Sequence, residues 1–127
     1  MVPLVVRSHY SLMRGTASVR RLARGAARMG YACLALTDTD NLYGLWPFLA
    51  ACREEGIRPI VGAEVTEPAR GRSAVCLVET DEGYRNLCRL LTRRHLGAAD
   101  FDLATALPER AAGLTVLTAD PGLLAAL

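Results

Sequence analysis

The sequence contains no lysine, so all fifteen of its basic residues are arginine, and they stand against thirteen acidic residues. The resulting net charge of +2 is too small to indicate nucleic-acid binding from total charge alone. The chain also lacks any apolar run near the ~18 residues that a membrane-spanning helix requires, and its first residues lack the features of a signal peptide. We therefore expect a cytoplasmic protein that makes no contact with a membrane.

Cysteines are few and irregularly spaced, and no Cys-x-x-Cys pair occurs. They are Cys33, Cys52, Cys76 and Cys88. This spacing argues against a disulfide scaffold and against a structural zinc site. Because each cysteine lies among apolar residues, we expect them to act as small core side chains.

The composition is that of a protein with a packed core. Of the 127 residues, 51% are hydrophobic and 22% are charged, which excludes wholesale disorder. This length predicts a single domain over residues 1–127. Because the sequence ends inside an apolar segment, we expect that domain to be incomplete and cut from a longer chain.

Short β-branched or apolar runs alternate with helical patterns along the chain. The predicted strands are 4–6, 32–37, 58–65, 74–79 and 114–117. The predicted helices begin at Thr16 or Ser18, Leu42, Thr80, Asp102 and Asp120. We expect 4–6 to be a buried first strand and 67–73 to be an exposed connection. The order predicts an α/β domain with a largely parallel sheet.

Polar clusters follow three of the predicted strands, at residues 7–10, 38–41 and 64–67. Ligands gather at the carboxyl ends of parallel strands, because connecting loops and helix N-termini meet there. These clusters are consistent with a shared pocket that holds carboxylates, a histidine and an arginine. They are equally consistent with polar loops that carry no function.

Three stretches of sequence together resemble a known family. They are residues 7–15 (Arg-Ser-His-Tyr-Ser-Leu-Met-Arg-Gly), residues 34–44 and residues 56–65. In this order they resemble the motifs of the PHP (polymerase and histidinol phosphatase) family. The resemblance is strongest to the PHP domains of bacterial DNA polymerase III α subunits, the error-prone type included. It implies the N-terminal portion of a distorted β/α barrel, of which 127 residues make roughly half.

The resemblance also implies where metal ligands would lie. Active members of the family hold a metal cluster, and its ligand positions fall here on Val5, Arg7, Arg14, Thr39 and Glu64. Only Glu64 keeps its ligand type. Valine has no donor atom, and arginine stays protonated and repels cations. We therefore predict a vestigial site with no cofactor, in which Glu64 is a ligand only if a metal is bound.

Two alternatives concern the side chains around that site. Arg7 or Arg14 either forms an ion pair with Glu64 or points into solvent. His9, Asp38 and Asp40 form a candidate pocket beside Glu64, and the two aspartates with Glu64 offer oxygen ligands for a divalent metal. Zinc, manganese and magnesium are the alternatives that the resemblance and the ligand chemistry leave open.

A few remaining side chains have mainly structural explanations. His9 is explained as a solvated or helix-capping side chain, with a ligand or phosphate contact as the alternative. His95 suits the C-terminus of its helix, where a cation complements the helix dipole. Trp46 and Phe48 are predicted to lie in the core.

Arginines form basic faces on two predicted helices. They are Arg20, Arg21, Arg24 and Arg28 on one, and Arg85, Arg89, Arg93 and Arg94 on the other. A solvated face is the simplest explanation, and contact with DNA or with a neighbouring domain is the alternative. An open sheet edge in an incomplete domain would also favour self-association.

The resemblance implies a role in DNA replication, DNA repair or translesion synthesis. The parent protein would be a DNA-directed DNA polymerase, a nucleotidyltransferase, whose active site lies outside these residues. This segment would be non-catalytic and would scaffold the polymerase. The alternatives are a metal-dependent phosphoesterase, a 3′–5′ proofreading exonuclease of the same fold, and a stand-alone binding module.

Overall fold

The computed structural model describes residues 1–97 and 99–127, and these residues form an open sheet of four strands in the order β1-β2-β3-β4. The strands are β1 (Cys33–Thr39), β2 (Arg58–Glu67), β3 (Arg72–Val78) and β4 (Leu114–Leu117). The α/β class and these four strands confirm the prediction, within a few residues at each end.

The expectation of a largely parallel sheet is wrong. Only β1 and β2 pair in parallel in the described sheet, whereas β2 with β3 and β3 with β4 are antiparallel. The connection between β2 and β3 is a short 3-10 turn, η1 (Pro68–Arg70), and one glycine. A link this short permits only a hairpin, because a parallel partner needs a crossover of about a dozen residues or more.

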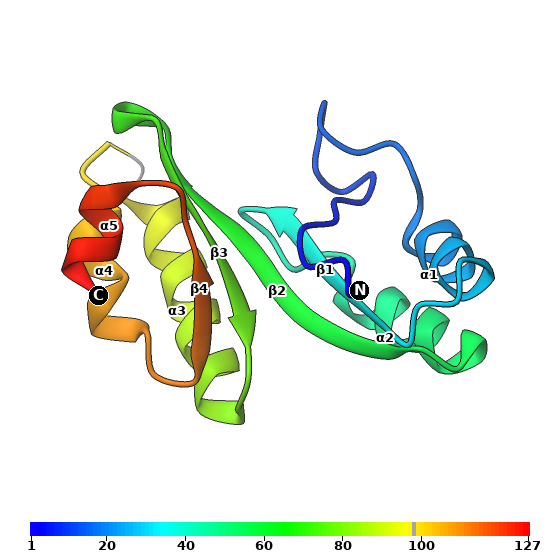
Figure 1. Ribbon diagram of the computed structural model, residues 1–127. Coiled ribbons are helices and arrows are strands. Elements are labelled where there is room, and N and C mark those ends of the chain that lie inside the picture. The colour runs from blue at the N-terminus through cyan, green and yellow to red at the C-terminus, as the bar shows by residue number, and fades with distance from the viewer. Residues whose placement is uncertain (98) are drawn as a thin grey trace.

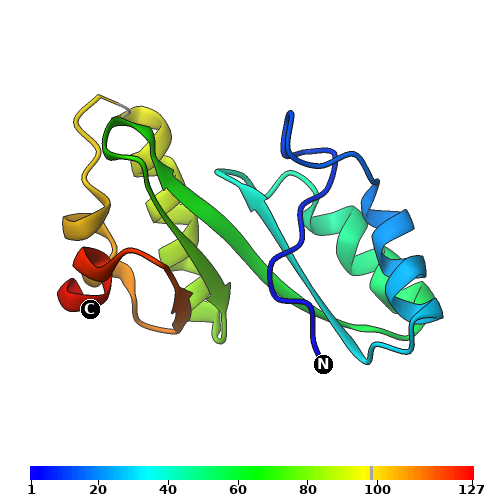
Figure 2. The same cartoon turned by 45° about the horizontal axis from the view of Figure 1, so that its top comes forward.

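Helices gather in two groups on either side of the twisted sheet (Figures 1 and 2). One group is α1 (Val19–Arg28) and α2 (Leu45–Glu55), beside β1. The other is α3 (Asp81–Leu96), α4 (Leu103–Ala106), η2 (Pro108–Arg110) and α5 (Pro121–Ala126), beside β3 and β4. Strand β2 is the long central strand between the two groups (Figure 1). None of the helices in the described part of the chain is long and apolar enough to cross a membrane.

Each helix group encloses a hydrophobic cluster against the sheet. Phe48, fully buried, lies at the centre of the α1–α2 cluster, and Leu87 and Leu107 are fully buried in the α3–α5 cluster. Trp46, in contrast, is 75% exposed, so its predicted place in the core is wrong. On α2, Phe48 faces β1. Trp46, two residues earlier, therefore lies on the outer surface of the helix.

The helix ends follow the local signals. Ser18 caps α1 by accepting a hydrogen bond from Arg21 N at 3.3 Å, and Asp120 caps α5 through Leu123 N at 3.0 Å. Gly56 ends α2 with φ +68°, a left-handed conformation in which a side chain would be strained. These short-range predictions are confirmed.

The described cysteines are free, as their spacing predicts. Three are buried and Cys88 is half-buried. Burial raises the pKa of the Cys52 thiol to about 11 and that of Cys76 to about 12. Both thiols therefore stay protonated and unreactive near neutral pH.

The N-terminal residues do not form the buried strand that was predicted. Residues 3–6 run beside β1 and accept two backbone hydrogen bonds, from Ala35 N to Pro3 O and from Thr37 N to Val6 O. Leu4 is 36% exposed and Val5 is 50% exposed. Val6 packs against the α1–α2 cluster, but two backbone hydrogen bonds to one neighbour leave this segment extended and short of a regular strand.

The connection predicted over 67–73 is exposed only at residues 68–71, because Glu67 ends β2 and residues 72–73 begin β3. Glu67 is 1% exposed, and its carboxylate accepts a hydrogen bond from Leu103 N at 3.0 Å and pairs with Arg70. It thus satisfies a free N–H in the first turn of α4. Glu67 is a structural carboxylate that ties the β2–β3 hairpin to the α3–α5 group.

Candidate functional site

A single buried carboxylate, Glu64, lies at the centre of the candidate site. It stands near the end of β2, where it pairs in register with Thr39 at the end of β1. Because these two strands are parallel, their carboxyl ends meet at one edge of the sheet. Glu64 is only 6% exposed, so its charge requires partners.

Three side chains donate to one oxygen of that carboxylate. Arg7 approaches Glu64 Oε2 through Nη2 at 2.8 Å and through Nε at 3.2 Å. Arg14 Nη1 donates to the same oxygen at 2.9 Å, and the Thr39 hydroxyl donates to it at 3.1 Å. The predicted ion pair therefore forms with both arginines, and neither of them simply points into solvent. We refer to Arg7, Arg14, Thr39 and Glu64 as the arginine–glutamate cluster.

Electrostatics in the arginine–glutamate cluster favour the ionised carboxylate. Burial alone would raise the pKa of Glu64, but the hydrogen bond and charge of Arg7, the Thr39 hydroxyl and the charge of Arg14 together lower it below its usual value. Two guanidinium groups against one carboxylate leave a surplus of one positive charge. A further cation would meet repulsion there.

The loop that carries Arg14 is held in place by Asp38. This carboxylate is 2% exposed and accepts hydrogen bonds from Ser8 N at 2.7 Å, Ser8 Oγ at 2.8 Å and Ser11 Oγ at 2.6 Å. The Ser11 hydroxyl in turn accepts from Thr39 N at 3.0 Å. Asp38 therefore anchors the loop and has no free oxygen facing Glu64.

The loop closes so tightly that one position excludes any side chain. A Cβ atom added at Gly15 would lie 2.1 Å from the carbonyl oxygen of Ser8. Met13, at the tip, adopts φ 62° although it is not a glycine, and it is fully exposed. The tight contact at Gly15 and the left-handed backbone at Met13 turn the loop back on itself. Arg14, which lies between them, therefore comes over the end of β1.

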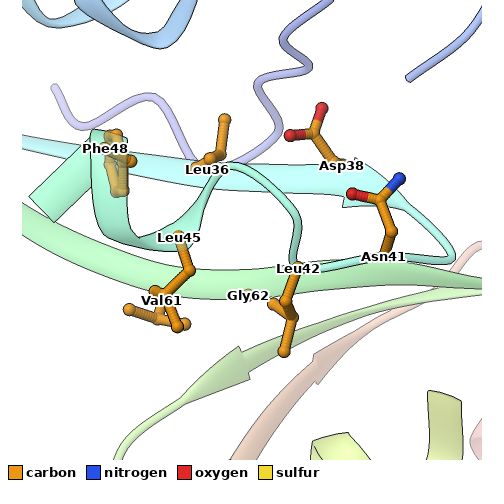
Figure 3. A pocket seen from close by; sticks show the side chains of 8 residues that line it. All are labelled: Leu36, Asp38, Asn41, Leu42, Leu45, Phe48, Val61 and Gly62. Carbon is orange, nitrogen blue, oxygen red and sulfur yellow. The ribbon is translucent and has the colours of Figure 1, made fainter. Parts of the chain in front are cut away.

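Asp38 also borders a small apolar cavity of about 10 Å³, lined mostly by Leu36, Leu42, Leu45 and Val61. In Figure 3 the carboxylate of Asp38 lies on the same side of β1 as Leu36 and points away from Leu42, Leu45 and Val61. A cavity of this size holds at most one water molecule. It is therefore a packing defect between β1, β2 and α2 and not a ligand pocket.

Asp40 serves a different part of the molecule. It has φ 55°, and its carboxylate accepts from Thr66 N at 2.8 Å and Thr66 Oγ1 at 2.5 Å. Arg94 lies 3.4 Å from the same carboxylate and also donates to the Thr66 carbonyl at 2.5 Å. Arg94 is thus not part of a solvated arginine face, because its side chain is only 13% exposed.

The three carboxylates proposed as an alternative oxygen site do not converge. Asp38 faces the serines of the loop, Asp40 faces Thr66 and Arg94, and Glu64 faces the arginines. Among residues 1–97 and 99–127, no group of three or more His, Cys, Asp or Glu side chains is placed to hold a metal ion. In this arrangement the three carboxylates face different partners and not one common position.

The histidines do not join the arginine–glutamate cluster. His9 is exposed and stacks near Tyr10, with ring centroids 4.3 Å apart. His95 Nε2 lies 2.5 Å from the carbonyl oxygen of Asp40, a contact between α3 and the end of β1. His95 lies in the last turn of α3, as expected, and this contact joins the helix end to the segment after β1. Val5 is aliphatic and half exposed, and it contributes no donor.

A groove of about 300 Å³ opens beside the cluster. Its polar lining includes Arg14, Thr39 and Glu64 of the cluster together with Thr66 and Arg72. Ser8 and Thr66 belong to the polar clusters noted at residues 7–10 and 64–67, but neither they nor Ser11 were predicted as site residues. The only sequence feature that could have indicated them is that each lies at or beside a strand end.

The residues present do not fit a metal cluster. Zinc and related ions need neutral imidazoles and carboxylates at about 2.0–2.2 Å, and several such donors must surround each ion. Glu64 offers one carboxylate, and its Oε2 is already occupied by three donor side chains. What the cluster can do is neutralise a buried charge and fasten the 7–15 loop to β1 and β2.

Together these features define an α/β domain with a polar site at the carboxyl ends of two parallel strands, the usual place for ligands in such folds. Comparison with known proteins then identifies the family. The model of the PHP domain matches residues 3–124, nearly the whole chain. The protein belongs to the PHP domain family.

Curated relatives of the chain are bacterial DNA polymerases. It is 44% identical over 86 residues to an error-prone DNA polymerase of Pseudomonas aeruginosa, a match that covers 68% of this chain. It is 38% identical over 94 residues to DNA polymerase III subunit alpha of Bacillus subtilis, covering 70% of this chain. In both cases the chain spans 8% of the relative's length. The resemblance drawn from the three motifs is confirmed.

Solved structures share the fold. A putative metal-dependent phosphoesterase from Bifidobacterium adolescentis superposes with a TM-score of 0.60 at 16% identity, covering 75% of this chain and 33% of that one. An amidohydrolase from Chromobacterium violaceum, solved with bound sulfate and no metal, has a TM-score of 0.59 at 25% identity. That match covers 96% of this chain and 45% of the other.

Proposed function

We propose that this chain is the first part of the PHP domain of a DNA polymerase III α-like protein, and that it is non-catalytic there. Its role is to scaffold the polymerase during DNA replication or translesion synthesis. The observation that carries the proposal is the double ion pair of Arg7 and Arg14 with Glu64. These arginines stand at positions where active members of the family have metal ligands.

Charge argues against hydrolysis at this site. A metal cluster activates water only where several anionic or neutral donors hold the cations. Here a cation would have to displace two guanidinium groups from Glu64 and then sit beside both of them. Guanidinium groups do not lose their protons at accessible pH, so the repulsion cannot be relieved by titration.

The relatives support a scaffolding role. The matched segment makes up about 8% of each of these polymerases, so other domains of the same protein are the expected partners. The open sheet is consistent with the first portion of a β/α barrel that further residues would complete. If this edge stays open, self-association through it is expected.

Metal analysis and activity assays test the proposal. The purified chain is dialysed against zinc, manganese or magnesium, and its metal content, phosphatase activity and 3′–5′ exonuclease activity are measured. We expect less than one equivalent of metal and no turnover. A variant carrying Val5→His, Arg7→His, Arg14→Asp and Thr39→His serves as the comparison, because it returns donor atoms to the site. Stoichiometric metal with turnover in the unaltered chain would overturn the proposal.

The second candidate is a metal-dependent phosphoesterase or proofreading exonuclease. Glu64 keeps the ligand type of active members, and one solved neighbour is described as a putative metal-dependent phosphoesterase. The same assays decide between the candidates. Activity that is abolished by a chelator and by Glu64→Gln would establish the second.

A further inference from the structure

A further cavity lies far along the chain from the arginine–glutamate cluster. It is a groove of about 520 Å³ between the C-terminal half of α3 and η2. Arg89 and Arg93 line it from α3, and Arg110 lines it from η2. Leu96 adds apolar surface and is 85% exposed, whereas Leu90 is buried. We call this feature the α3 groove.

Arginines continue beyond the α3 groove along the same helix face. Arg85, Arg89 and Arg93 are each exposed and follow one another at intervals of four residues. Successive members of such a row are about 6 Å apart along the helix axis. The row and Arg110 therefore form a positive strip along α3 that enters the groove.

Few carboxylates neutralise this strip. Glu109 lies 3.0 Å from Arg93, an exposed pair that water screens. Within the described residues, Arg85, Arg89 and Arg110 have no carboxylate within ion-pair distance. The strip keeps a surplus of positive charge although the whole chain is close to neutral.

We propose that the α3 groove binds the sugar-phosphate backbone of single-stranded DNA. Guanidinium groups hold phosphates through paired hydrogen bonds, and a row of them suits a polymer with one negative charge per unit. The exposed Leu96 side chain offers an apolar surface to the face of an unpaired base. In a duplex, that face is covered by the stacked neighbouring bases. An acidic protein segment has no such regular charge spacing, and it is the competing occupant that the test addresses.

This inference goes beyond the proposed function, because scaffolding requires no contact with DNA. Binding is expected to be independent of sequence and weak, with a dissociation constant on the order of 10⁻⁴ to 10⁻⁶ M at physiological salt. The logarithm of the affinity should fall with the logarithm of salt concentration by about 0.7 for each phosphate contacted.

Fluorescence anisotropy tests the proposal with a labelled oligothymidylate of about fifteen nucleotides, a length that spans a typical single-strand site. The double variant Arg89→Ser/Arg110→Ser is compared with Arg20→Ser/Arg28→Ser on α1, which removes the same charge from the other basic helix. We expect the first to weaken binding at least about tenfold at low salt and to lower the salt slope by about 1.4. We expect the α1 variant to change binding less than about twofold. Melting temperatures confirm that both variants fold.

Glu109→Gln gives an independent readout. It frees Arg93 from its carboxylate, so binding should tighten and the salt slope should increase. If both double variants lose the same affinity for the oligonucleotide, net charge alone attracts the DNA, and the proposal is overturned. Stronger binding of the matching duplex, or displacement of the oligonucleotide by equimolar polyaspartate, would also overturn it. None of these outcomes bears on the metal and activity assays that test the proposed function.

Discussion

At the scale of single residues, the chemistry of the site depends on which side chains surround one carboxylate. Glu64 is buried, and Arg7, Arg14 and Thr39 all donate to its Oε2. A lone buried carboxylate would be costly, so the arginines stabilise the fold at the same position where they oppose a cation. The same two guanidinium groups therefore account for the stability of the buried carboxylate and for the proposed loss of metal binding.

Replacement of Arg7 tests this stabilisation. Arg7→Met should lower the free energy of unfolding by about 1–2 kcal/mol, because it removes two hydrogen bonds from a buried carboxylate. The matched control is Arg24→Met, whose partner Glu55 lies 3.5 Å away in an exposed pair and which should cost less than about 0.5 kcal/mol. Urea unfolding measures both. Equal effects in the two variants would contradict the structural role of the cluster.

The pH dependence of stability gives a second residue-scale prediction. The pKa of Glu64 is lower in the folded chain than its ordinary value of 4.5, so its ionisation stabilises the fold above that value. This contribution is lost as the pH falls through the lower folded pKa. The difference in unfolding free energy between the unaltered chain and Glu64→Gln should therefore shrink between about pH 6 and pH 3. A difference that stays constant or grows on acidification would contradict the assignment.

At the scale of elements, the loop from Ser8 to Gly15 positions Arg14, and its shape depends on backbone contacts. The Asp38 carboxylate holds the loop through Ser8 and Ser11. At Gly15, the absence of a side chain allows the two ends of the loop to touch. The loop is therefore a fixed part of the fold and not a mobile cover over the site.

Two glycines make a matched test of this element. Gly15→Ala should destabilise the chain by about 1–3 kcal/mol, because the new methyl group meets the Ser8 carbonyl at 2.1 Å. Gly25→Ala, inside α1 with nothing within 4 Å, should stabilise it by about 0.5–1 kcal/mol. Thermal or urea unfolding measures both, and hydrogen exchange of residues 8–15 should increase only in the first. A neutral Gly15→Ala variant would show that the loop can relax.

At the scale of the whole molecule, one continuous sheet joins two hydrophobic clusters. Strand β2 pairs with β1 over seven residues and with β3 over six. Strand β2 takes part in both pairings, so loss of its pairing with β1 would weaken its pairing with β3. We therefore expect the molecule to unfold as one cooperative unit.

Two native thiols test this cooperativity, one in each cluster. Cys52 lies in the α1–α2 cluster and Cys76 in the α3–α5 cluster, and both are fully buried. Thiol labelling in increasing urea, read by mass spectrometry, should show the same midpoint for both. Labelling of Cys52 well before Cys76 would instead show that the two halves unfold separately.

The sequence by itself determined what depends on near neighbours. The cap at Ser18, the end of α2 at Gly56 and the buried strand β1 followed from capping, backbone freedom and apolar runs. The residue types at the motif positions also excluded most metal ligands before any geometry was known. These features depend on interactions within a few residues, and the sequence displays such interactions directly.

Tertiary structure alone decided which of these groups meet. Arg7 and Glu64 are 57 positions apart, and whether they pair depends on how β1, β2 and the loop fold together. Asp38 and Asp40 look equivalent in sequence, and strand alternation alone would place them on one face, but the left-handed φ of 55° at Asp40, just after the end of β1, sends its carboxylate to a different partner. The antiparallel direction of β3, the exposure of Trp46 and the arginine-lined groove on α3 likewise depend on packing between distant segments, which local patterns do not encode.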